Sequence, residues 1–155
     1  MKSKKRNAKK NQNGSTFTLK RIDNLDILCE DADKLVSFYH GTLGLPFFLE
    51  YKKGQGWAAI DAGSLTIYIM PSDKSVHAPR RTPVNPENPP GFDSFAFEID
   101  DLDAAIAELT ARGVEWAGEV THWKHPTGTW YRYRPFYDPE GNMLYVTEPH
   151  KKKKP

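Results

Sequence analysis

The sequence predicts one α+β domain made of two copies of a strand–helix–strands module. Its 155 residues fit a single domain, which can bury roughly 70% of its surface on folding. A hydrophobic pattern that begins near residue 23 returns near residue 93, an offset of 70. Between the copies, residues 71–91 hold six of the twelve prolines, so we expect a connecting loop there.

Each copy begins with a half-buried strand. Residues 22–29 and 92–99 alternate between apolar and polar side chains, as strands with one buried face do. The apolar positions are expected to pack against the helices, and they are Leu25, Ile27, Cys29, Phe95, Phe97 and Ile99. The polar positions of both strands should therefore face the other side of the sheet.

A capped helix should follow each of these strands. Asp31 or Asp33 can accept hydrogen bonds from the free N–H groups at the start of the first helix, and Asp101 can do so for the second. Gly44 and Gly113 are expected to end the two helices, because glycine readily adopts the left-handed conformation found there.

Further strands complete each module as βαβββ. They are expected near residues 47–51, 57–61, 65–70, 115–121, 129–136 and 143–147. The domain should span residues 20–149, with module one at 20–70, the linker at 71–91 and module two at 92–149. Residues 1–19 and 150–155 are expected to be basic tails.

The positive net charge of +2 comes from the two ends of the chain. Residues 1–10 carry six Lys or Arg and residues 151–154 carry four, whereas residues 11–150 carry 12 basic and 20 acidic side chains. A nucleic-acid-binding domain is expected to hold its positive charge on a folded face. We therefore interpret the ends as solvated tails; weak contact with nucleic acid or an anionic membrane is the alternative.

The composition favours a cytoplasmic protein. Cys29 is the single cysteine, which excludes an intramolecular disulfide and suits a reducing compartment. No apolar stretch approaches the roughly 18 residues that a membrane span needs, and no apolar segment follows the charged start as it would in a secretory signal. We expect Cys29 to be a small buried side chain.

Several stretches, taken in order, resemble the vicinal oxygen chelate superfamily. These are the βαβββ repeat, Phe38-Tyr39 followed by Leu43-Gly44-Leu45, the stretch from Phe97 to Leu102, and the turn from Asp138 to Asn142. The superfamily includes glyoxalase I, bleomycin- and fosfomycin-resistance proteins and extradiol dioxygenases. The resemblance implies the glyoxalase/bleomycin-resistance fold, an incomplete barrel around a cleft with the helices outside, and a frequent homodimer.

The same resemblance argues against a metal cofactor. Metal-dependent members place His, Gln or Glu at one cleft-facing position on each of four strands. The corresponding residues here are Asn24, Tyr68, Ser94 and Tyr145. One neutral amide cannot hold a divalent ion against water, and the tyrosines would have to ionise despite pKa values near 10. We expect neither a metal nor another cofactor.

The expected cleft is aromatic and mildly acidic. Strand alternation, with the resemblance deciding the face of residues 129–136, gives its lining as Asn24, Asp26, Tyr68, Ser94, Glu98, Tyr131, Tyr133 and Tyr145. Such a surface suits a flat or cationic organic ligand through stacking and cation–π contacts. The alternative is that the tyrosines only fill a collapsed barrel. Arg80 and Arg81 belong either to an exposed, mobile loop or to an anion contact.

Three classes of function are consistent with these observations. The first is a metal-independent protein that binds and sequesters a small organic molecule, as bleomycin-resistance relatives do. The second is a metal-free lyase, isomerase or cyclase with Asp26 or Glu98 as general base. The third is a non-catalytic interaction module. The fold does not decide among them.

Overall fold

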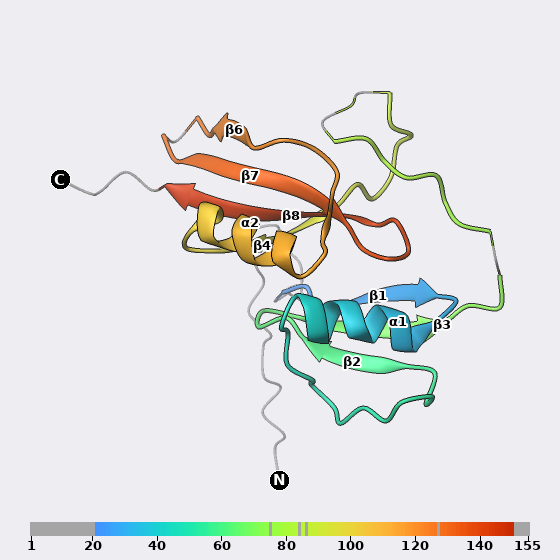
Figure 1. Ribbon diagram of the computed structural model, residues 1–155. Helices are drawn as coiled ribbons and strands as arrows, with labels where there is room; N and C mark the ends of the chain where they lie inside the picture. Colours follow the sequence, from blue (N-terminus) through green and yellow to red (C-terminus); the bar gives the residue numbers. More distant parts are fainter. Residues whose placement is uncertain (1–20, 75, 84, 86, 127, 151–155) are drawn as a thin grey trace, which may run out of the picture.

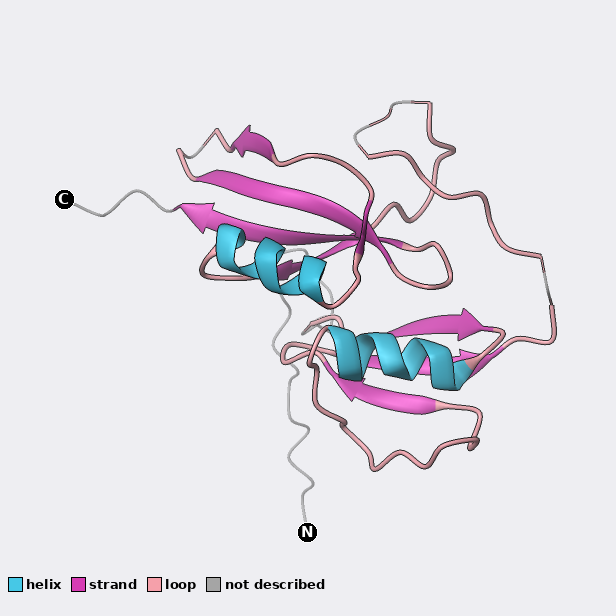
Figure 2. Cartoon of the chain, in the orientation of Figure 1, coloured by secondary structure: helices cyan, strands magenta, loops and turns pink. Residues whose placement is uncertain are grey.

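The computed structural model describes residues 21–150, except residues 75, 84, 86 and 127. The tails predicted at residues 1–19 and 150–155 lie outside this range, except for His150, which the structure places at the end of a strand. The described chain forms two open sheets and two α-helices, which confirms the α+β prediction (Figures 1 and 2). Neither sheet closes into a barrel.

Sheet A contains the three strands of module one. Strand β1 (Asn24–Cys29) lies parallel to β3 (Thr66–Pro71), and β2 (Ala58–Asp61) lies antiparallel to β3 on its other side. Along β1, Ile27 and Cys29 are buried, while the alternate residues Asp26 and Leu28 are exposed. The predicted alternation of β1 is therefore confirmed.

Sheet B contains the strands of module two in the order β4-β8-β7-β5, with β6 paired to β7. Their bounds are β4 Phe95–Glu98, β5 Glu115–Trp116, β6 Thr121–Lys124, β7 Trp130–Tyr137 and β8 Met143–His150. As in sheet A, the first strand of the module is parallel to the last, and the others are antiparallel.

The helix boundaries follow the predicted caps. Asp31 accepts a hydrogen bond from the Lys34 N–H at 3.1 Å and starts α1 (Ala32–Val36), which continues as the π-helical segment η1 (Ser37–Thr42). Asp101 accepts from the Ala104 N–H at 2.9 Å and starts α2 (Leu102–Ala111). Asp33, the other predicted cap, instead accepts hydrogen bonds from Tyr51 and Gly54.

Both helices cover the same side of the sheets (Figure 1). α1 lies against sheet A and α2 lies over β4 and β8. No helix of the described residues covers the opposite face of either sheet. No helix in the described part of the chain is long and apolar enough to cross a membrane.

Two predicted strands differ from the structure. Residues 47–51 form only the bridge between Phe47 and Ile60, because the N–H groups of Phe48 and Leu49 both donate to the Ala59 carbonyl and the ladder loses its register. Residues 115–121 break into β5 and the separate β6. Pro135, opposite the break, has no N–H to offer, and the Gly118 carbonyl accepts from the Arg134 side chain instead.

One buried core joins the two modules. It includes Leu35 and Tyr39 from the first module and Phe136 and Leu144 from the second, each 0% exposed. The Tyr39 hydroxyl donates to Asp138 Oδ2 at 3.0 Å, and Asp138 is itself only 2% exposed. The single cysteine is buried as well, and burial raises its pKa to about 11.

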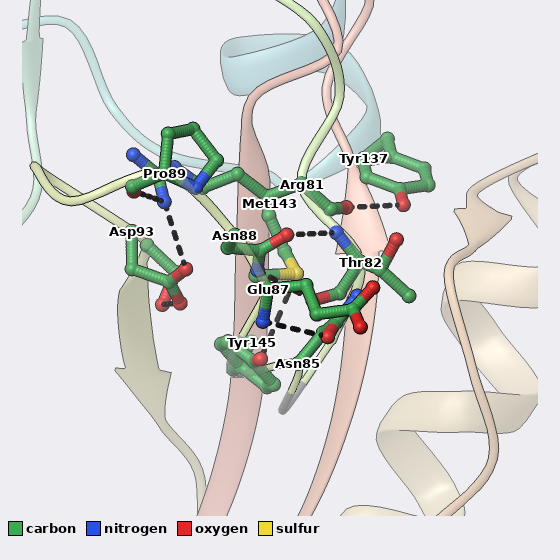
Figure 3. A network of polar contacts seen from close by, with 11 residues as sticks. Arg81, Thr82, Asn85, Glu87, Asn88, Pro89, Asp93, Tyr137, Met143 and Tyr145 are labelled. Carbon is green, nitrogen blue, oxygen red and sulfur yellow. Dashed lines mark hydrogen bonds and ion pairs between the residues drawn. The ribbon is translucent and has the colours of Figure 1, made fainter.

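The predicted linker began one residue too early, because Pro71 still belongs to β3. Its other described residues form no helix or strand, as predicted, but its arginines are paired within the chain. Arg80 donates to Glu115 at 2.7 Å and lies over the Tyr137 ring. Arg81 lies 3.6 Å from Asp93, and its carbonyl accepts from the Tyr137 hydroxyl at 2.8 Å (Figure 3). These contacts fasten the linker to module two and leave neither guanidinium free for an anion.

The Tyr39→Phe variant should be less stable than the wild type at pH 8 by about 1.5–3 kcal/mol, the range for a buried hydrogen bond to a charged group. Burial, reinforced by the charge of Asp138, raises the pKa of Tyr39 well above 10.0. Below about pH 10 the Tyr39 phenol is protonated in both the folded and the unfolded chain, and its contribution to stability is complete. Above about pH 10 it ionises in the unfolded chain first, which favours unfolding and reduces this contribution. The stability gap should therefore narrow above about pH 10.

Urea unfolding of both proteins at pH 8, 9, 10 and 11 measures this gap. Tyr68→Phe is the control, because the hydroxyl of this half-buried tyrosine on β3 forms no hydrogen bond with other described residues. A gap that stays constant to pH 11, or that is absent at pH 8, would show that the Tyr39 hydroxyl does not join the modules.

Candidate functional site

The helix-free face of sheet B carries rows of aromatic side chains. Residues paired across neighbouring strands point to the same side of a sheet, as do alternate residues along one strand. Tyr133 pairs with Thr147 of β8, and Tyr131 pairs with Trp123 of β6. Tyr145, two residues before Thr147 on β8, pairs with Ala96 of β4.

These rows line a shallow, open pocket of about 290 Å³. Its lining is Ala96, Trp123, Tyr131, Tyr133, Tyr145 and Thr147. Trp123 and Tyr131 are tilted against each other with ring centroids 5.5 Å apart, and Tyr133 meets Tyr145 edge to face at 5.5 Å. We call this site the aromatic pocket.

The tyrosine hydroxyls of the aromatic pocket differ in their partners. The Tyr145 hydroxyl donates to the sulfur of Met143 at 3.6 Å (Figure 3), and burial followed by the charge of Asp93 raises its pKa to about 12. The hydroxyls of Tyr131 and Tyr133 form no hydrogen bond with other described residues. Both are therefore available to a ligand as donors and acceptors.

The structure divides the predicted site residues between the two sheets. Of the eight, Tyr131, Tyr133 and Tyr145 line the aromatic pocket. Glu98 stands beside it on β4, paired with Thr147, and is exposed. Ser94 precedes β4, and its hydroxyl donates to Asp93 at 3.2 Å.

The other three predicted residues lie on sheet A. Asn24 donates to Asp26 at 2.9 Å, and Asp26 pairs with Tyr68 across β1 and β3. The predicted meeting of Tyr68 with the other tyrosines does not occur in the aromatic pocket.

Asp26 lines a second, larger cavity of about 530 Å³. This cavity lies between β1, the linker and the turn that precedes β8. On its wall, His77 of the linker approaches Glu30 of module one at 3.6 Å and Glu140 of module two at 3.2 Å. Its mixed lining of acids, bases and apolar groups differs from the uniform aromatic surface of the first pocket.

Trp123 is the pocket residue that sequence reasoning left unplaced, between a cap on the cleft and a dimer contact. The predicted strand ended at residue 121, two residues before it. The alternation that places Thr121 opposite Tyr133 continues to Trp123 opposite Tyr131, so extending the strand pattern by one step would have found it.

Comparison with known proteins identifies the family. The profile of the Glyoxalase/Bleomycin resistance protein/Dioxygenase superfamily matches residues 21–146. The chain belongs to this superfamily. The Bacillus subtilis (strain 168) protein YwkD is 30% identical over 131 residues, which cover 84% of this chain and 98% of YwkD.

Solved structures of the superfamily share the fold. The crystal structure of SMU.1112c is 25% identical, with a TM-score of 0.63, and the match covers 84% of this chain and all of that one. A glyoxalase/bleomycin resistance protein/dioxygenase from Nocardioides is 22% identical with a TM-score of 0.60, covering 93% of each chain.

The donor set does not fit the divalent metal that many members of this superfamily use. The four corresponding positions, Asn24, Tyr68, Ser94 and Tyr145, offer one amide, one hydroxyl and two phenols, with no His or carboxylate among them. The raised pKa of Tyr145 disfavours the phenolate that a metal would need. Within the described residues, no group of three or more His, Cys, Asp or Glu side chains is placed to hold a metal ion.

Truncating a pocket tyrosine should cost less stability than truncating a core ring of the same strand. Phe136→Ala should lower the free energy of unfolding by about 3–5 kcal/mol, because Phe136 is 0% exposed. Tyr133→Ala should cost about 1–2 kcal/mol, since its pocket-facing side has fewer contacts to lose. Urea unfolding of both variants tests this. Equal losses would mean that Tyr133 is core filling and that the pocket is closed in solution.

Proposed function

We propose that the protein binds a small organic molecule, flat or cationic, in the aromatic pocket, and that it acts by sequestering this molecule without a metal. The observation that carries the proposal is the pocket itself. Four aromatic side chains from three strands meet on a helix-free face, and two of their hydroxyls have no partner among the described residues. Neither hydroxyl is among the buried polar atoms that lack a partner, so both are open to solvent and can hydrogen-bond to a ligand in place of water.

The size and chemistry of the pocket support a small ligand. Its volume of about 290 Å³ lies at the lower end of the range for small-molecule sites, roughly 300–1,000 Å³. Such sites combine a largely apolar, aromatic wall with a few polar groups that fix orientation. Here Tyr131, Tyr133 and Thr147 supply those polar groups.

The positions of Asp26 and Glu98, the two candidate general bases, favour sequestration of the ligand over an enzymatic reaction. Asp26 lines the larger cavity instead of the aromatic pocket. Glu98 is exposed at the edge of the pocket. A general base has to lie within hydrogen-bonding reach of the proton it removes, and neither carboxylate is enclosed with the tyrosines.

Loss of one ring face should weaken binding by roughly two- to thirty-fold, as an aromatic contact is worth about 0.5–2 kcal/mol. A ligand is first found by thermal-shift screening of flat, cationic and neutral natural products. Calorimetry then compares Tyr133→Ala with Asp26→Asn, which removes a charge from the other cavity and should leave affinity unchanged. If Tyr133→Ala keeps full affinity while Asp26→Asn loses it, the ligand occupies the larger cavity and the proposal fails.

Binding should not depend on a divalent metal. Chelation by EDTA should leave both the melting temperature and the affinity unchanged, because the four family metal positions offer one amide, one hydroxyl and two phenols. Elemental analysis of the purified chain is the direct measurement. Close to one zinc, iron, manganese or nickel per chain would contradict metal independence.

We further propose that the protein is a homodimer. Large apolar side chains are exposed on or beside the open face of sheet A: Leu28 at 64%, Met70 at 39% and Trp57 at 39%. Exposed apolar clusters of this kind are typical of interaction surfaces. Light scattering at micromolar concentration should give the mass of two chains, and Leu28→Glu should shift it to one. A wild-type protein that stays monomeric would contradict the proposal.

We place the protein in the cytoplasm. The support is the single, buried and unpaired cysteine, which suits a reducing compartment. Fractionation of cells that express the chain tests this location.

A further inference from the structure

The rings of the aromatic pocket do not form a slot for a planar molecule. Stacking on both faces of a flat ligand requires two nearly parallel walls. Tyr133 and Tyr145 instead lie at 72° to each other, and Trp123 and Tyr131 at 33°. Rings presented at several angles surround a compact, rounded group better than they sandwich a flat one.

Among the described residues, the charges around the aromatic pocket are also one-sided. No Lys or Arg contributes to its lining. Arg132 pairs with Asp103 of α2, and Arg134 lies over Trp116, so both point to the helix side of sheet B. The linker arginines are each held by a carboxylate, Arg80 by Glu115 and Arg81 by Asp93.

Glu98 is the uncompensated charge at this site. It is on β4 two residues beyond Ala96, and it pairs with Thr147, so it stands on the pocket side of the sheet. Its side chain forms no ion pair or hydrogen bond with the described residues. A carboxylate beside several aromatic faces attracts a cation through two additive effects, the carboxylate charge and the ring quadrupoles.

We propose that the aromatic pocket recognises a quaternary or tertiary alkylammonium group, with the rings contacting the alkyl groups on the nitrogen and Glu98 attracting its charge from beside the pocket. This inference rests on the proposed function and narrows its ligand class. The pocket volume accommodates a trimethylammonium group together with a short substituent that reaches the hydroxyls of Tyr131 and Tyr133.

Two isosteric probes separate charge from shape. Choline carries a trimethylammonium group, and 3,3-dimethylbutan-1-ol has the same shape with a neutral carbon in place of nitrogen. NMR titration of the full chain should show choline binding about 2- to 30-fold more tightly than the neutral alcohol. This preference should decrease between 20 mM and 500 mM salt, because part of it comes from the exposed carboxylate.

Matched variants assign the preference to the rings and to the acid. Tyr133→Phe keeps the ring face and should keep the preference, whereas Tyr133→Leu should lose much of it while still binding the neutral alcohol. Glu98→Gln should reduce the preference, and Glu119→Gln, on a side chain that is 95% exposed and pairs with Arg134, should not.

The outcomes separate this inference from the proposed function. Equal affinity for choline and the alcohol would overturn cation recognition and leave small-molecule binding in place. Cation recognition would also be overturned if choline did not bind while a neutral flat compound did, provided that Tyr133→Ala abolished binding of that compound. Small-molecule binding in the pocket would again remain. If neither probe nor any screened compound bound, both proposals would fail.

Discussion

The hydroxyl of Tyr39 crosses from module one to module two and meets Asp138 inside the protein. The Asp138 carboxylate also accepts hydrogen bonds from the N–H groups of Glu140 and Asn142 and from the Asn142 side chain. With the Tyr39 hydroxyl these occupy about as many acceptor sites as a carboxylate has. A buried charge is tolerated only when it is hydrogen-bonded in this way, so the joint between the modules and the geometry of the turn depend on each other.

The same turn determines the candidate site. Residues 138–142 connect β7 to β8 and fix the register that pairs Tyr133 with Thr147. That register brings Tyr133 and Tyr145 into edge-to-face contact. The aromatic pocket therefore depends on the same turn as the joint between the modules, although no pocket residue takes part in that joint.

Sequence reasoning predicted the parts of the fold that local patterns determine. Alternation gave the buried faces of β1 and β4, and Asp31 and Asp101 marked the helix starts because their caps involve only neighbouring residues. The break between β5 and β6 was not predictable from residues 115–121, since its cause is Pro135 on the opposite strand.

The candidate site was predictable to the extent that one strand determines it. Alternation placed Tyr131, Tyr133 and Tyr145 on one face, but it could not say which tyrosines share a pocket. Which tyrosines share a pocket depends on how the strands pair and on the division into two sheets. Tyr68 belongs to sheet A and is therefore separated from the other three. The position of Trp123 in the pocket depends on the β6–β7 register. The hydrogen bond from the His125 N–H to the Thr129 carbonyl closes the loop between these two strands.

The topology also gives a second role to the two acidic residues on the open faces. β1 and β4 are edge strands, and within the described residues their outer edges pair with no other strand. Unpaired edges are templates on which another chain can add a strand, and a charge on an edge strand opposes such growth. Asp26 and Glu98 stand on these two edge strands, where a carboxylate opposes the addition of a further strand. Neutralising both should make the chain more prone to polymerise through its sheets, which repeated light scattering of a double variant during incubation would reveal.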